Sequence, residues 1–135
     1  MLILDTHAWV EWVNSPEILP TNLRLSLENS EESLSISIIS CYEVALLVNR
    51  GRITLDRPIA RWFDEAIQGA GIESLGMTPE IAEIAAGLPQ IHKDPWDRLI
   101  IATAQAYNVP LVTRDENIHK YPNLQAVWNF APERQ

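Results

Sequence analysis

The chain has 135 residues, of which 47% are hydrophobic and 21% charged, as expected for one globular domain over residues 1–135. Its formal net charge of −8 argues against a partner held by bulk electrostatics, such as duplex DNA. The single cysteine excludes an internal disulfide, and no apolar stretch approaches the roughly 20 residues that a membrane span needs.

The first part of the chain alternates short strands with helices. Residues 2–5 form an apolar run that predicts a strand, and the run reaches an acidic residue without the basic region of a signal peptide. Helices are expected over residues 7–14 and, starting near Pro20, through residues 22–30. Residues 33–39 alternate and then become fully apolar, which predicts the second strand.

Two helices are expected in the middle of the chain. The first begins at Ser40 as N-cap, with Glu43 three residues later as in a capping box, and ends at Gly51. The second covers about residues 57–69, where apolar side chains recur at helical spacing.

The remaining elements continue the same alternation. Three further strands are predicted, over residues 72–77, 109–113 and 124–128. Thr78 and Pro79 carry the signals of a helix start, and residues 95–107 form the most apolar helix, closed by Asn108. Strands that alternate with helices indicate an α/β fold with a mostly parallel sheet covered on both faces.

Acidic residues stand where this fold would bring them together. Asp5 and Asp115 end two apolar strands, Glu43 lies at the start of a helix, and Asp97 opens the most apolar helix, with Asp94 as a fifth candidate. Strand carboxyl ends and helix amino ends share one edge of an open parallel sheet. Carboxylates gathered there repel one another unless a cation holds them, so we predict a site for one or two Mg²⁺ or Mn²⁺ ions.

Each carboxylate also has an ordinary explanation. Glu43 could only complete a capping box, Asp97 only complement a helix dipole, and Asp115 only cap a turn. Asp5 is harder to explain in this way. Separate structural roles would have to place four carboxylates at one edge of the sheet independently, whereas a metal site accounts for all four at once. If the cluster exists, neutralising one member, Asp115 for example, should stabilise the metal-free protein.

The motifs around these residues resemble those of PIN-domain nucleases, specifically toxin ribonucleases of the VapC type. LDTHAWVEW, with Asp5, is similar to the family's first motif, and SCYEV, with Glu43, to its second. DPWDRLIIATAQAYNVPLVTRD resembles the third and fourth motifs together, with Asp97 and Asp115 as their acidic residues. Asp94 matches a subgroup with a D-P-aromatic-D-R sequence.

The resemblance implies a PIN-like three-layer α/β/α sandwich with a mostly parallel five-stranded sheet. It implies a cytoplasmic endoribonuclease, the toxin of a type II toxin–antitoxin system, that hydrolyses RNA phosphodiester bonds with Mg²⁺-activated water. The expected cofactor is Mg²⁺ or Mn²⁺. The expected partners are RNA and a small cognate antitoxin, in a homodimer or a hetero-oligomer with that antitoxin, with no membrane.

Four other residues beside the acidic motifs are candidates. Thr113, from the T-R-D sequence, is assigned to the catalytic set, and Thr6 could accept a scissile phosphate or orient a water. Arg98 and Arg114 adjoin the acidic residues, and arginine forks suit phosphate, so both are expected to bind substrate.

Further polar and aromatic residues are assigned structural roles. His7 and His92 could act as general acids, but we favour ordinary polar positions for both. Four arginines fall close together around one helix-to-helix turn, and we interpret them as solvated helix ends: Arg50, Arg52, Arg57 and Arg61. The five tryptophans could stack on bases, but core or interface positions are favoured for most.

Two alternative functions stay open at this point. One is a catalytically idle PIN-fold module for protein interaction. The other is a metal-dependent phosphatase with Asp5 as nucleophile, although position 7 is His and the D-x-D signature of one large phosphatase family is missing. Metal-dependent RNA cleavage, with Asp5→Asn as control, would discriminate among these functions.

Overall fold

The computed structural model describes residues 1–128, and an all-parallel sheet of five strands forms the centre of this part of the chain. The strands are β1 (Leu2–Leu4), β2 (Leu34–Ser37), β3 (Glu73–Leu75), β4 (Leu111–Val112) and β5 (Ala126–Val127). Their order across the sheet is β3-β2-β1-β4-β5, with Ile3 opposite Ser35 on one side and Leu111 on the other. The predicted five-stranded sheet is therefore confirmed.

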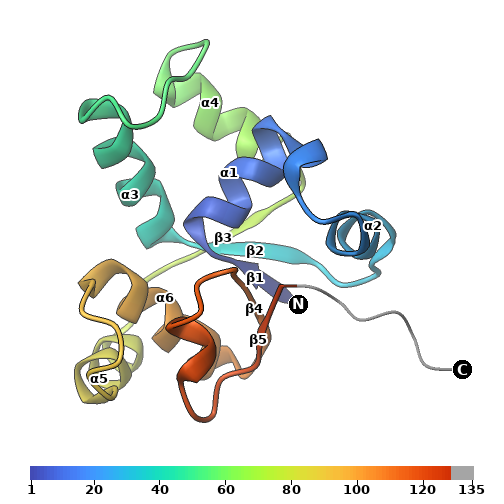
Figure 1. Ribbon diagram of the computed structural model, residues 1–135. Coiled ribbons are helices and arrows are strands. Elements are labelled where there is room, and N and C mark those ends of the chain that lie inside the picture. Colours follow the sequence, from blue (N-terminus) through green and yellow to red (C-terminus); the bar gives the residue numbers. More distant parts are fainter. Residues whose placement is uncertain (129–135) are drawn as a thin grey trace, which may run out of the picture.

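Helices cover both faces of this sheet. They are α1 (Thr6–Asn14), α2 (Thr21–Asn29), α3 (Ile38–Asn49), α4 (Ile59–Ala66), α5 (Pro79–Gly87) and α6 (Pro95–Tyr107), with 3₁₀ turns η1 (Pro16–Ile18) and η2 (Ile118–Lys120). Figure 1 shows α1 to α4 on one side of the sheet and α5 and α6 on the other. This arrangement confirms the three-layer α/β/α sandwich. No helix within residues 1–128 combines the length and the apolar character that crossing a bilayer requires.

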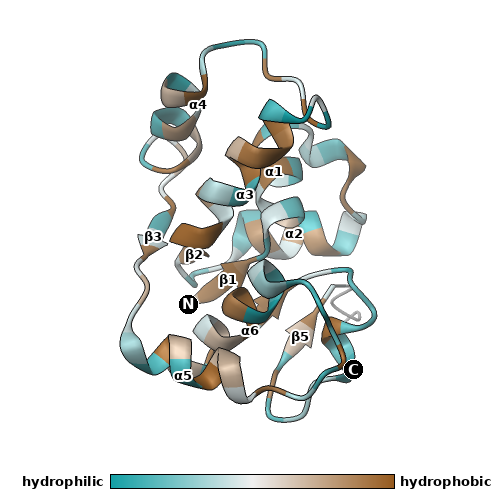
Figure 2. Ribbon diagram, turned by 90° about the vertical axis from the view of Figure 1, so that its left-hand side faces the viewer, coloured by the Kyte–Doolittle hydropathy of each residue, from teal (hydrophilic) through white to brown (hydrophobic). Residues whose placement is uncertain are grey.

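The sheet separates the hydrophobic core into two large clusters, one on each face. Leu2 and Leu4 belong to one buried cluster with Trp9, whereas Ile3 belongs to a second cluster with Ile100. Successive strand side chains point to opposite faces, so a strand buried on both faces reads as a continuous apolar run. Figure 2 shows apolar residues gathered on β1, β2 and the adjoining part of α1.

The boundary between β2 and α3 differs from the prediction. Residues 38–39 were expected in the strand, but the helix begins at Ile38, and the Ser37 side chain accepts the Ile39 amide at 3.1 Å. Ser40 as N-cap was therefore wrong, and Glu43 is not a capping-box partner. A short apolar run does not separate strand from buried helix, which explains the shift. Gly51, with a φ of 70°, follows the end of α3 as predicted.

The helices on the other face agree more closely with the sequence. The Thr78 hydroxyl accepts the Ile81 amide at 3.2 Å, as an N-cap should. α6 covers Pro95–Tyr107, the predicted range, and Asn108 ends it in the left-handed conformation with a φ of 55°. The domain expected over residues 1–135 includes residues 129–135, which lie outside the described residues.

Candidate metal centre

Asp5 occupies the carboxyl end of the central strand. Its backbone amide still bonds to the Val112 carbonyl at 3.0 Å, and its Oδ1 accepts the Ala8 amide at 2.8 Å, so Asp5 is the N-cap of α1. The side chain is buried at 6% exposure. Burial raises the pKa of Asp5, against the lowering effect of hydrogen bonds from Thr113 and Ala8, and the nearby Glu43 charge raises it further.

Asp97 lies where the negative charges converge. Burial raises the pKa of Asp97 to about 7, and the charges of Glu43, Asp94 and Asp5 add to this rise, while His92 lowers it. The structure therefore brings four of the five predicted carboxylates into one electrostatic cluster.

Two overlapping donor groups share Asp97. Glu43, Asp94 and Asp97 each offer a carboxylate oxygen, and these atoms lie within 4.8 Å of one another. A second group consists of His92, Asp97 and Asp115, whose ligand atoms also lie within 4.8 Å of one another. The all-oxygen group suits a hard cation such as Mg²⁺ or Mn²⁺. Because a cation would offset the mutual repulsion that raises the pKa of Asp97, these residues fit the metal expected for the site.

Asp115 joins the cluster through His92, which sequence reasoning missed as a site residue. His92 Nε2 lies 2.9 Å from Asp115 Oδ2 and 3.1 Å from Asp97 Oδ2. The Asp94 amide donates to His92 Nδ1 at 3.2 Å, so Nδ1 acts as an acceptor and the ring proton belongs on Nε2. The ring thus directs its Nε2–H at two carboxylates. The H-x-D-P spacing is the signal that could have identified it.

The other oxygen of Asp115 caps a turn. Oδ1 accepts the amides of Asn117 at 2.8 Å and Ile118 at 3.3 Å, so the turn-capping role and the site role coexist. Partial burial works against ionisation of Asp115, but the His92 bond and these two amides outweigh it and lower the pKa. The expectation that neutralising Asp115 would relieve strain therefore does not follow from the structure. The strain falls on Asp97 and Asp5.

Two buried threonines form hydrogen bonds with carboxylates of the cluster: Thr6 with Glu43 and Thr113 with Asp5. Thr6 Oγ1 lies 2.6 Å from Glu43 Oε1 and 2.9 Å from Ser40 Oγ. A hydroxyl has one proton and a carboxylate can only accept, so Thr6 donates to Glu43 and leaves the Ser40 hydroxyl to donate to it. The Asp115 amide donates to Thr113 Oγ1 at 3.1 Å. Both threonines are buried, so the structure does not support substrate contact by Thr6.

Arg98 has a structural role instead of the expected substrate-binding one. Its guanidinium donates to the carbonyl oxygens of Ala85 at 2.9 Å, Leu88 at 3.0 Å, Pro89 at 2.9 Å and His92 at 3.4 Å. Only 9% of the residue is exposed. These bonds satisfy carbonyls at the end of α5 and in the loop that carries His92, so Arg98 fixes that loop against α6.

Replacing Arg98 with Gln should lower the free energy of unfolding by about 3 kcal/mol. The reason is that several buried carbonyls lose a charged donor that a shorter amide cannot replace. Urea denaturation measures the change, with Arg24→Gln as control, since the one ion pair of Arg24 within residues 1–128 is an i,i+4 contact with Glu28 at 4.0 Å. A loss no larger than that of the control would contradict the structural role.

Arg114 is already paired. Its guanidinium contacts the carboxylate of Glu11 and lies 5.6 Å from the centre of the Trp128 ring. The side chain is 52% exposed. A substrate-binding role for Arg114 stays a prediction, since binding phosphate there would compete with these contacts.

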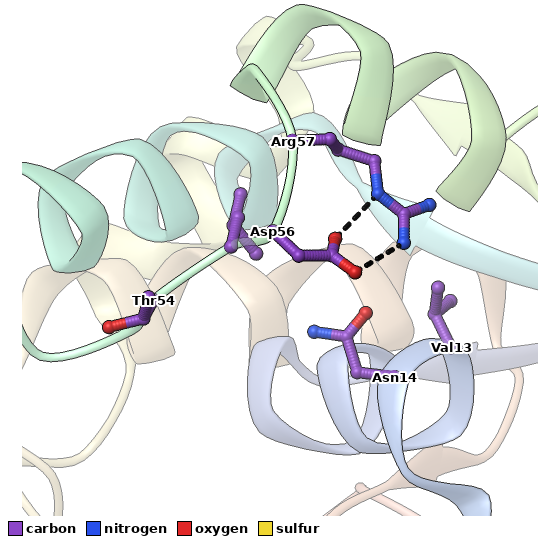
Figure 3. A pocket seen from close by; sticks show the side chains of 6 residues that line it. Val13, Asn14, Thr54, Asp56 and Arg57 are labelled. Atoms are coloured by element: carbon purple, nitrogen blue, oxygen red, sulfur yellow. Dashed lines mark hydrogen bonds and ion pairs between the residues drawn. The ribbon is translucent and has the colours of Figure 1, made fainter.

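Two hollows flank α1 and α3, and one of them adjoins the acidic cluster. Figure 3 shows the other, a hollow of about 300 Å³ in which Arg57 bonds to Asp56 at 2.7 and 3.1 Å, beside Asn14 of α1. The charges there cancel. The second hollow, of about 480 Å³, is lined by Glu43 and Asp94. Chemistry that uses the acidic cluster therefore has an open approach on this side.

Comparison with known proteins agrees with the geometry. Residues 2–124 match the family model of the PIN domain. The chain is 33% identical to Ribonuclease VapC22 of Mycobacterium tuberculosis over 130 residues, which cover 94% of this chain and 98% of that protein.

Solved structures share the fold. The crystal structure of VapBC2 from Rickettsia felis bound to a promoter DNA fragment contains a chain with a TM-score of 0.67 and 20% identity, covering 94% of this chain and 98% of that one. A toxin–antitoxin complex from Klebsiella pneumoniae matches with the same TM-score and identity over 96% and 98% of the two chains. At this level of identity the likeness concerns the fold alone.

Proposed function

The chain belongs to the PIN-domain family, and we propose that it is a metal-dependent endoribonuclease, the toxin of a type II toxin–antitoxin pair. The observation that carries the proposal is the cluster of Asp5, Glu43, Asp94 and Asp97, in which the pKa of Asp97 rises to about 7. The full-length similarity to a protein named a ribonuclease supports the same activity.

Each residue of the cluster has a defined task in this proposal. Glu43, Asp94 and Asp97 would hold the cation, Mg²⁺ or Mn²⁺, and Asp5 and Asp115 would complete the acidic set. A divalent cation bound there supplies Lewis acidity, which lowers the pKa of a water and screens the phosphate charge.

The buried residues around the cluster fix the positions of these ligands. Thr6 holds Glu43, and the Thr113 hydroxyl, through its bonds with Asp5 and the Asp115 amide, sets the spacing between two strand ends. His92 holds Asp97 and Asp115 together through Nε2. Such a shell keeps the ligands in place before substrate binds, which is where an enzyme without a covalent intermediate gains its rate.

The proposed partners follow from relatives. The solved neighbours come from VapBC and toxin–antitoxin complexes, which supports a small antitoxin as partner of this chain, in a homodimer or hetero-oligomer. RNA is proposed as substrate because the curated relative is a ribonuclease. A single domain over residues 1–135 and a cytoplasmic location belong to the same proposal.

Removal of divalent cations tests the activity directly. Cleavage of a fluorogenic single-stranded RNA should disappear on chelation with EDTA and return with Mg²⁺ or Mn²⁺ in excess, because the carboxylates alone cannot screen the phosphate charge. Asp5→Asn, purified in the same way, controls for contaminating ribonuclease. Cleavage that persists in EDTA, or that Asp5→Asn retains at the wild-type rate, would contradict the proposal.

A further inference from the structure

The cleft that adjoins the acidic cluster carries two kinds of charge. Its volume is about 480 Å³, and Glu43 and Asp94 line it at the metal end. Arg50 and Arg52 line it as well, where the chain leaves α3. A cleft with carboxylates at one end and guanidinium groups at the other suits a ligand that binds a cation with one phosphate and arginine with the next.

These two arginines differ from the others in how they are paired. Within residues 1–128, the guanidinium groups that contact a carboxylate or a backbone carbonyl are those of Arg24, Arg57, Arg61, Arg98 and Arg114. In that part of the chain, Arg50 and Arg52 have neither kind of partner. In a chain with a net charge of −8, two unpaired arginines beside the site are a local exception.

Helix α3 sets the distance between the two ends of the cleft. Glu43, Leu46, Leu47 and Arg50 line the cleft and follow the i, i+3, i+4, i+7 spacing of one helix face. Seven residues at the helical rise place Arg50 about 10 Å from Glu43 along the axis. A short stretch of a nucleic-acid strand can therefore lie along α3 with its phosphates at both ends.

An aromatic side chain also lines the cleft. Trp96 lines the same cleft from the first turn of α6, and its ring meets Tyr42 edge-on with 4.9 Å between ring centres. Tyr42 is 50% exposed, so this aromatic pair is open to solvent on one side. Such a pair offers a stacking surface for a base of either type.

We propose that this cleft is the track for a single RNA strand beside the cleaved bond, with Arg50 and Arg52 holding a neighbouring phosphate and Trp96 stacking on a base. The inference rests on the proposed ribonuclease function, because the strand enters the cleft from the phosphate at the metal centre. An acidic protein segment would also suit two arginines and a bound cation, but its carboxylates leave the aromatic pair without a stacking partner. Half-buried Trp96 together with exposed Tyr42 provides a surface on which a base can stack, and this favours RNA.

Affinity for RNA, measured without cleavage, tests the track. A fluorescein-labelled single-stranded RNA of about 12 nucleotides is titrated with Asp97→Asn protein, in which we expect the probe to stay intact. Adding Arg50→Gln and Arg52→Gln should weaken binding about tenfold and reduce the slope of log affinity against log salt by about 1.4. Trp96→Leu should weaken binding about tenfold with the salt slope unchanged.

A charge-matched pair provides the control. Arg24→Gln with Arg61→Gln removes the same charge from helices outside the cleft and should change affinity by less than about twofold. Thermal melting of each variant shows whether the fold persists. This control is needed because the positive charge of Arg50 at the carboxyl end of α3 also stabilises the helix through its dipole.

The outcomes separate the track from the activity. Equal affinities of the Arg50/Arg52 variant and its control overturn the track, even if wild type cleaves RNA. Loss of antitoxin binding with RNA affinity unchanged also overturns it and makes the cleft a protein site. Arginine-dependent RNA binding supports the track, and it does so even if no cleavage is found and the proposed function fails.

Discussion

Asp97→Asn is expected to lower RNA cleavage at least about a thousandfold without unfolding the chain. Asp97 belongs to both donor groups, so its loss removes one ligand from each. The fold should persist, because the raised pKa of Asp97 shows that its negative charge is unfavourable in the metal-free protein. Initial rates on a fluorogenic RNA at saturating Mg²⁺, together with thermal melting, measure the two effects.

Two other substitutions calibrate this result. Asp94→Asn should reduce cleavage less, because Asp94 belongs to one donor group and its Oδ1 is engaged by the Trp96 amide at 2.9 Å. Asp64→Asn makes the same chemical change on the exposed side of α4 and should leave the rate unchanged. If Asp94→Asn proves as severe as Asp97→Asn, the assignment of separate roles is wrong. A near-normal rate for Asp97→Asn would remove it from the metal site.

The second large effect is that the metal-free protein should lose stability as the pH rises from about 4 to 8. The pKa of Asp97 is about 7 in the folded chain, above its ordinary value of 3.8, so the folded state binds more protons in this interval. The contribution of Asp97 to the free energy of unfolding is therefore fully present below about pH 4 and is lost as the pH rises through 7. A shift of this size corresponds to at most about 4 kcal/mol. The raised pKa of buried Asp5 acts in the same direction.

Urea denaturation in EDTA at several pH values measures this loss, and Asp97→Asn tests its source. The variant should be more stable than wild type at pH 8 and should show a smaller pH dependence. Millimolar Mg²⁺ should stabilise wild type at pH 8 by mass action and help the variant less. Equal pH profiles for the two proteins would show that Asp97 does not bear the strain. Below pH 4, the lowered pKa of Asp115 gives the opposite dependence, since its protonation weakens the His92 contact.

Local patterns in the sequence are enough to predict most helices and strands and to place the acidic residues approximately. Continuous apolar runs predict buried parallel strands, and the helix over residues 95–107 was located by Pro95 at its start and Asn108 at its end. Asp5 and Asp115 could be placed at one edge because both follow strands of a parallel sheet. Each of these conclusions depends on local periodicity and on a rule of topology, so no contact had to be known.

Which side chains contact one another depends on how distant segments pack in the folded chain. His92 and Asp115 are 23 residues apart, and Thr6 and Glu43 are 37 apart, so no spacing in the sequence relates them. The sequence suggested Arg98 as a phosphate ligand, but in the folded chain its guanidinium donates to backbone carbonyl oxygens. The pairing of a charge and its pKa depend on burial and on distances of a few ångströms between distant segments. Hydrophobic periodicity carries no information about either quantity, which is why the strain on Asp97 and the unpaired state of Arg50 emerged only from the folded chain.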